Sequence, residues 1–145
     1  MKNANYLLTG LTLPNGSKSD ITISDGVITE IASNIIAAPG FTKVDLAGSI
    51  ALPGLVDFHT HLREPGKEDA ETVLSGTMAA AKGGFVAVSA MANTSPVADT
   101  AGVVEQVFAL GQSAGFADVF PIGAVTEGLK GENLAEIGAM ADSRA

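Results

Sequence analysis

The sequence predicts an α/β fold in which a small β unit, residues 1–50, is followed by alternating strands and helices. Three observations support this prediction. Short β-rich runs fill the first unit, apolar strand-like runs alternate with alanine-rich stretches after it, and glycines follow two of those stretches. Of the 145 residues 46% are hydrophobic, which is enough for a folded core. We therefore expect an antiparallel β unit followed by a parallel sheet covered by helices.

The β unit is predicted from its turn signals. Two dipeptides, Asn15-Gly16 and Asp25-Gly26, separate short runs that are rich in β-branched residues. Both dipeptides favour tight hairpins because their residues adopt positive φ angles readily. The second domain is accordingly expected to span residues 51–145.

The second domain is predicted to contain three strand-helix pairs. The strands are apolar runs, and the helices have apolar residues at helical spacing. In chain order, the expected elements are a strand at 51–62, a helix at 70–84, a strand at 85–91, a helix at 100–115, a strand at 118–125 and a helix at 133–142. This order implies parallel strands with helices as the connections.

Three parallel strands leave the edges of a sheet unpaired. A closed barrel of alternating strands and helices needs about eight strands and typically about 250 residues. If the fold is a TIM-type (β/α)8 barrel preceded by the β unit, this chain contains only the start of the barrel, and we expect it to be truncated.

Charge and composition exclude several classes of partner. The chain has 8 basic and 16 acidic residues, a net charge of -8, and no basic cluster, so nucleic acid and anionic membranes are not expected to bind. The first ten residues do not form a signal peptide, and no run approaches the roughly 20 apolar residues of a membrane span. Because there are no cysteines, disulfides and thiolate metal sites are excluded. A cytoplasmic protein is expected.

The stretch LPGLVDFHTHLREPG contains both histidines of the chain. Side chains alternate between the two faces of a strand, so His59 and His61 should share one face. They lie near the carboxyl end of the predicted strand, where α/β barrels place their catalytic groups. Strict alternation assigns to this face Asp57, His59, His61 and Arg63, and to the face beneath the helices Val56, Phe58, Thr60 and Leu62.

This polar face is a candidate metal site. Two imidazoles at positions i and i+2 can bind one zinc ion, with nitrogens about 2.0–2.1 Å from it. Arg63 adds a planar cation suited to a carboxylate. In the plainer reading, both histidines only hydrogen-bond to neighbours, but burying two imidazoles and a guanidinium together is costly unless they are paired or metal-bound. Asp57 lies one layer deeper and is expected to orient a histidine or to have a structural role, and not to bind the metal directly.

This stretch, together with ETVLSGTMAAAKGGFVAV and MANTSPVAD, resembles the dihydroorotases of the amidohydrolase superfamily. The likeness continues through GAVTEGLKGENLAEIGAMADS. It implies that the first unit is the amino-terminal part of a β-sandwich and that the rest is the first three βα units of a metallohydrolase barrel. One departure is Ala92, where the family commonly has proline, so the turn before Asn93 should be less rigid.

The resemblance implies roles for four residues. His59 and His61 match the first two ligands of one or two zinc ions, and Arg63 and Asn93 match the residues that bind the substrate carboxylate. The family also uses a bridging acidic residue or carboxylated lysine, two further histidines and a general-base aspartate. These are expected beyond Ala145, so this segment alone is expected to be inactive.

The activity implied by the resemblance is the reversible cyclisation of N-carbamoyl-L-aspartate to L-dihydroorotate in pyrimidine biosynthesis. A metal ion activates water and polarises the ring carbonyl, and an aspartate transfers the proton. Two alternatives stay open: another cyclic amidohydrolase, such as an allantoinase or a hydantoinase (dihydropyrimidinase), and a catalytically silent structural partner. Arg63 argues against a hydantoinase, whose substrates need no carboxylate anchor. A homodimer, or association with another pyrimidine-pathway enzyme, is a further expectation.

Overall fold

A computed structural model describes residues 4–36 and 38–145 of the chain. The chain divides into two compact units, Met1–Pro53 and Gly54–Ala145, and each is described by itself. Within the described ranges, every helix is too short or too polar to cross a membrane.

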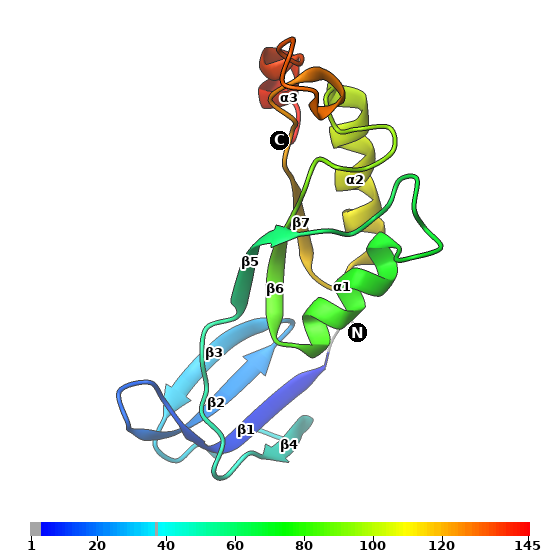
Figure 1. Ribbon diagram of the computed structural model, residues 1–145. Coiled ribbons are helices and arrows are strands. Elements are labelled where there is room, and N and C mark those ends of the chain that lie inside the picture. The colour runs from blue at the N-terminus through cyan, green and yellow to red at the C-terminus, as the bar shows by residue number, and fades with distance from the viewer. Residues whose placement is uncertain (1–3, 37) are drawn as a thin grey trace. The chain divides into compact units, whose positions relative to one another are not determined.

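The first unit is a four-stranded sheet with the strand order β3-β2-β1-β4 (Figure 1). Its strands are β1 (Asn5–Thr12), β2 (Lys18–Ser24), β3 (Val27–Ala32) and β4 (Phe41–Asp45). The two hairpins predicted at the turn dipeptides are confirmed, since β1 pairs with β2 and β2 pairs with β3 in antiparallel fashion. The expectation of a wholly antiparallel unit is wrong, because β4 pairs with β1 in parallel. The whole β2–β3 hairpin lies between them in sequence, which leaves enough chain for a parallel return.

One carboxylate ties the strands of this unit to its loops. Asp20 accepts hydrogen bonds from the backbone N–H of Gly10 at 3.0 Å and of Ile35 at 3.1 Å. These bonds favour the ionised form, the one from Gly10 most, so they hold the pKa of Asp20 below 3.8, its usual value.

The second unit is a parallel three-stranded sheet, in the order β5-β6-β7, with α1 and α2 on one side (Figure 1). Its order of strands and helices is the predicted one, with a short 3-10 helix that was not predicted. The elements are β5 (Leu55–Thr60), α1 (Val73–Lys82), β6 (Phe85–Ala90), α2 (Ala101–Ala114), β7 (Asp118–Pro121), η1 (Glu127–Leu129) and α3 (Ile137–Asp142).

Local sequence explains where the two longer helices begin and end. α1 begins at a capping box, in which Thr72 Oγ1 accepts from the Ser75 N–H and Ser75 Oγ accepts from the Thr72 N–H, each at 3.0 Å. α2 ends at Gly115, whose φ of 67° is left-handed. α2 lies close to β7 at Gly111, where any side chain would collide with Val119.

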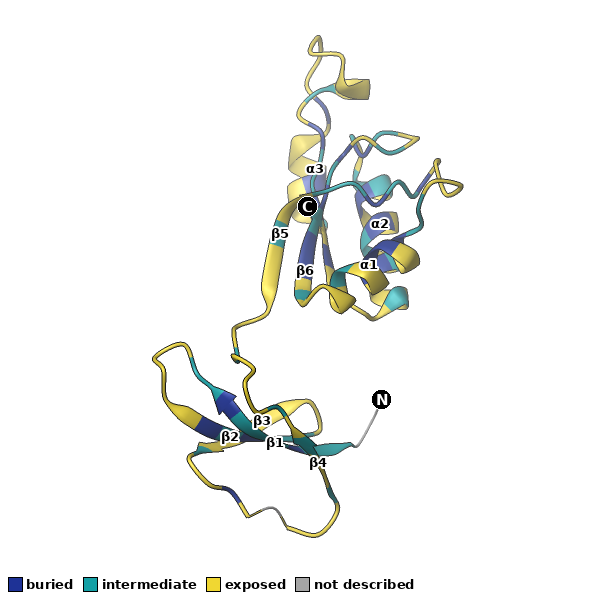
Figure 2. Ribbon diagram, turned by 60° about the horizontal axis from the view of Figure 1, so that its bottom comes forward, coloured by how far each residue is buried: buried dark blue, intermediate teal, exposed yellow. Residues whose placement is uncertain are grey.

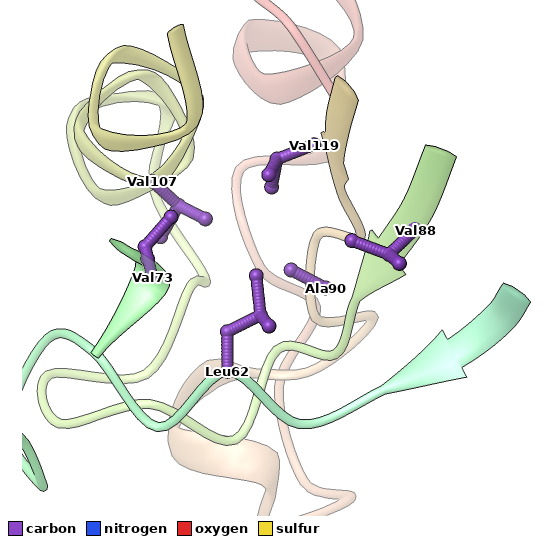
Figure 3. Packing of buried hydrophobic residues seen from close by; sticks show 6 residues of the cluster. All are labelled: Leu62, Val73, Val88, Ala90, Val107 and Val119. Carbon is purple, nitrogen blue, oxygen red and sulfur yellow. The ribbon is translucent and has the colours of Figure 1, made fainter. Parts of the chain in front are cut away.

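The core of this unit lies between the sheet and the two helices. Figure 3 shows side chains from β6, β7, α1 and α2 converging there, together with one from the segment after β5. The cluster consists of Leu62, Val73, Val88, Ala90, Val107 and Val119, all of them buried. Burial also differs between neighbouring strands of the sheet. Figure 2 shows that β6 is largely buried and β5 largely exposed.

Candidate active site

The strand that carries the histidine motif does not keep regular alternation. Asp57 pairs with Val88 and Thr60 pairs with Ala90, so β5 has one residue more than β6 between these pairs. Val88 and Ala90 belong to the core beneath the helices, and paired residues on neighbouring strands share a face. Asp57 therefore faces the helices, and the prediction that it shares the face of the histidines is wrong. The physical reason is a β-bulge, whose extra residue shifts the alternation.

The bulge also changes which apolar residues are covered. Thr60 and Leu62 lie on the helix side as predicted, and Leu62 is only 3% exposed. Val56 and Phe58 were predicted to pack beneath the helices, but their side chains are 47% and 78% exposed. That prediction is wrong for both residues.

Asp57 fixes the backbone of the motif. Its Oδ1 accepts a hydrogen bond from the His59 backbone N–H at 3.0 Å. This bond is the main reason why the pKa of Asp57 lies below 3.8, and the nearby Thr60 hydroxyl lowers the pKa further. Thr60 Oγ1 is buried, and it makes no hydrogen bond of acceptable geometry with any described group. Asp57 thus contacts the histidine motif through the backbone of His59.

The imidazoles of His59 and His61 lie side by side. Their ring centroids are 5.1 Å apart, and the ring planes are inclined at 69°. Two rings bound to one tetrahedral zinc through nitrogens at about 2.0–2.1 Å would have their centres roughly 5 Å apart. The donor set and its spacing therefore fit a shared metal ion.

The structure brings Asn93 to the same place. Its Oδ1 lies 2.8 Å from Nδ1 of His61, although the two residues are 32 positions apart in the sequence. Asn93 follows β6, whereas His61 follows β5, and these parallel neighbours end at the same edge of the sheet. Sequence reasoning grouped both residues in one site but did not anticipate this hydrogen bond.

Arg63 is positioned by a loop and not by the strand. β5 ends at Thr60, so the strand alternation used to place the guanidinium does not reach it. The backbone of Arg63 has a φ of 63°, a left-handed conformation that costs a non-glycine residue roughly 1–2 kcal/mol. Among the described side-chain contacts, the Arg63 guanidinium makes no hydrogen bond to Asn93. The structure thus joins the two histidines and Asn93, while Arg63 lies in the adjoining loop.

The loop after His61 is fastened to the loop that carries Asn93. The Ser95 N–H donates to the Pro65 carbonyl oxygen at 2.9 Å. Gly66 adopts a φ of 101°, and a side chain there would collide with the Ser95 carbonyl oxygen. Neither Ser95 nor Gly66 was predicted to contribute to the site, and the only sequence signal was the Pro-Gly pair that ends the strand.

Two acidic side chains brace the same loop. Glu64 Oε2 accepts from the Val73 N–H at the start of α1, and Glu68 Oε1 accepts from the Gly66 N–H, each at 2.7 Å. The second bond is the main reason why the pKa of Glu68 lies below 4.5, its usual value. The first bond therefore ties the loop to the start of α1, and the second links two residues within the loop.

The described residues contain no group of three or more His, Cys, Asp or Glu side chains placed to hold a metal ion. The chain supplies the two imidazoles of His59 and His61, and it has no other histidine.

Comparison with known sequences identifies the family. A family model described as dihydro-orotase-like matches residues 48–145. The dihydroorotase of Leifsonia xyli subsp. xyli is 63% identical over 145 residues, which cover 100% of this chain and 33% of that protein. The dihydroorotase of Streptomyces coelicolor is 58% identical over 139 residues, 96% of this chain and 32% of that protein. The chain thus spans about a third of the length of these relatives.

Solved structures share the fold. An L-hydantoinase (dihydropyrimidinase) from Arthrobacter aurescens has a TM-score of 0.71 at 19% identity, over 87% of this chain and 28% of that one. A dihydropyrimidinase from Brevibacillus agri has a TM-score of 0.62 at 23% identity, over 84% of this chain and 27% of that one. At these identities the likeness establishes the fold alone. On the sequence matches, the chain belongs to the dihydroorotase-like family.

Proposed function

We propose that the protein carrying this chain is a zinc-dependent dihydroorotase, which reversibly cyclises N-carbamoyl-L-aspartate to L-dihydroorotate. The observation that supports this most is the pair of imidazoles 5.1 Å apart, with Asn93 hydrogen-bonded to one of them. It occurs in a chain that is 63% identical along its whole length to a dihydroorotase. Because the chain spans about a third of that relative, the proposal concerns the complete protein.

In the proposed site, His59 and His61 hold the metal through their imidazole nitrogens. A bound zinc ion supplies Lewis-acid polarisation of the ring carbonyl and a nucleophilic water near neutral pH. Arg63 donates to the substrate carboxylate from its planar guanidinium, and the Asn93 amide donates to the same group. These contacts restrict the orientation of the ring, which lowers the entropy cost of reaching the transition state.

The carboxylate contacts provide the substrate test. The complete protein should hydrolyse dihydroorotate in preference to hydantoin and allantoin, because only dihydroorotate offers the ring carboxylate that Arg63 would bind. Preferred hydrolysis of hydantoin or allantoin would instead make the protein another cyclic amidohydrolase. A protein purified without chelator that lacks both zinc and turnover would be a silent structural partner.

Two substitutions test the residue roles. Arg63→Gln should raise the KM for dihydroorotate about 10- to 100-fold, the effect of losing hydrogen bonds to a charged group. His61→Ala should remove zinc and turnover together. Lys67→Gln is the matched control, because Lys67 is an exposed basic residue of the same loop. An unchanged KM in Arg63→Gln would remove Arg63 from the site.

Three further features stay predictions of the same proposal: a small carboxylate substrate, a cytoplasmic location, and assembly as a homodimer or with another pyrimidine-pathway enzyme. Size-exclusion chromatography of the complete protein, alone and with candidate partners, tests the assembly.

A further inference from the structure

The hydrogen bond between His61 and Asn93 determines which ring nitrogen of His61 is free. An amide oxygen can only accept, so Nδ1 of His61 must carry the proton of the 2.8 Å contact with Asn93 Oδ1. In a neutral imidazole the other nitrogen, Nε2, then has its lone pair available. Nε2 is therefore the nitrogen of His61 that stays free for a metal ion shared with His59.

Asn93 is held in place without any help from a substrate. On one side, the Met91 N–H donates to the Thr60 carbonyl oxygen at 2.9 Å, which ties the end of β6 to the end of β5. On the other side, the Ser95 N–H donates to Pro65 at 2.9 Å. The loop between these two anchors contains Asn93, so its amide is positioned in advance.

The Asn93 amide has two ends with different capacities. Its oxygen is occupied by His61, while its NH2 group keeps two donors. A carboxylate is an acceptor only and can use these donors. One side chain can therefore contact the metal ligand and the substrate carboxylate at the same time.

We infer that Asn93 is a positioning residue for His61, which holds the imidazole in the tautomer that presents Nε2 to the metal, in addition to its contact with the substrate. The inference rests on the proposed function in that it takes His61 as a metal ligand. Partners of this kind behind a metal-bound histidine typically change metal affinity or activity by 10- to 100-fold.

The test separates the two ends of the Asn93 side chain in the complete protein. Asn93→Leu removes the acceptor and the donors, so it should weaken zinc retention about 10- to 100-fold. Asn93→Asp keeps an acceptor for Nδ1 of His61 but replaces the donors by a negative charge. It should retain zinc to within about threefold of the wild type, while its KM for dihydroorotate rises. Zinc retention is measured without substrate, by competition with a chelating dye and by metal analysis.

Arg63→Gln serves as the matched control, because it should raise KM and leave zinc retention unchanged. Wild-type zinc retention in Asn93→Leu would overturn the inference. So would equal zinc loss in Asn93→Leu and Asn93→Asp, or equal loss in Arg63→Gln, since either would point to general disturbance of the loops. If Asn93→Leu does not fold, Asn93→Ala takes its place with the same expectation.

The outcomes also distinguish this inference from the proposed function. A protein that fails to turn over dihydroorotate contradicts the function. If its zinc retention still falls in Asn93→Leu and persists in Asn93→Asp, the positioning role stands.

Discussion

The two sides of the sheet β5-β6-β7 differ in how their residues are covered. On the side of α1 and α2, Val88 and Val119 are at most 2% exposed. On the opposite side, Val56 and Phe120 are 47% and 52% exposed. The site lies at the edge where β5 and β6 end: His59 is near the end of β5, and His61, Arg63 and Asn93 lie in the loops that follow these strands. Stability therefore depends on the helix side, while site geometry depends on the loop contacts.

The largest expected effect comes from two neighbouring residues of β7. Val119→Ala removes buried methyl groups and should lower the free energy of unfolding by about 2–3 kcal/mol. Phe120→Ala deletes more atoms from the exposed side and should cost about 1 kcal/mol or less. Denaturant unfolding of the 145-residue chain measures both. If Phe120→Ala lost more stability than Val119→Ala in this chain, the contrast between the two sides of the sheet would be contradicted. If it did so only in a longer protein, the side that carries Phe120 would be covered in that protein.

The next effect concerns the contact between the two loops. Gly66 and Gly84 both have left-handed φ angles, 101° and 85°, but only a side chain at Gly66 would meet another part of the chain, the Ser95 carbonyl oxygen. Alanine at either position lowers the free energy of unfolding by roughly 1–2 kcal/mol, because a residue with a Cβ is strained at a left-handed φ. Gly66→Ala should lose about 1–2 kcal/mol more than Gly84→Ala, because the 2.9 Å bond from Ser95 to Pro65 is disturbed. Equal losses in denaturant unfolding would mean that the loops do not constrain each other.

The smallest effect is on acid stability, to which both units contribute. Asp20 in the first unit and Asp57 in the second have pKa values below 3.8, mainly because they accept backbone N–H bonds. The unfolded chain then binds more protons than the folded chain in acid. Their stabilisation is present above about pH 4 and is lost as the pH falls through the lowered pKa values.

Unfolding free energies measured from pH 7 down to pH 2.5 test this dependence. Asp57→Asn should make the free energy of unfolding fall less steeply at acid pH, since asparagine keeps an acceptor for the His59 N–H but does not titrate. An equally steep fall in this variant would show that Asp57 has no lowered pKa.

The sequence carried the information for the order of elements and for the grouping of the site. His61 and Asn93 were placed in one site by the resemblance to the dihydroorotases, and the structure brings them within 2.8 Å of each other. The bulge in β5 could not be predicted, because register depends on the partner strand, so Asp57 was placed on the wrong face. The left-handed backbone of Arg63, with a φ of 63°, was likewise not predicted.

The parallel pairing of β4 escaped prediction for a related reason. Turn dipeptides determine which strands form hairpins, and both hairpins were found in this way. No local signal specifies which strand a later segment joins, and β4 pairs with β1 across the intervening hairpin.

The most direct test of the site is anomalous diffraction at the zinc edge from crystals of the complete protein. We predict zinc about 2.0–2.1 Å from Nε2 of both His59 and His61, with Asn93 Oδ1 still bonded to Nδ1 of His61. Zinc bound elsewhere with both imidazoles free, or bound through Nδ1 of His61, would contradict the account.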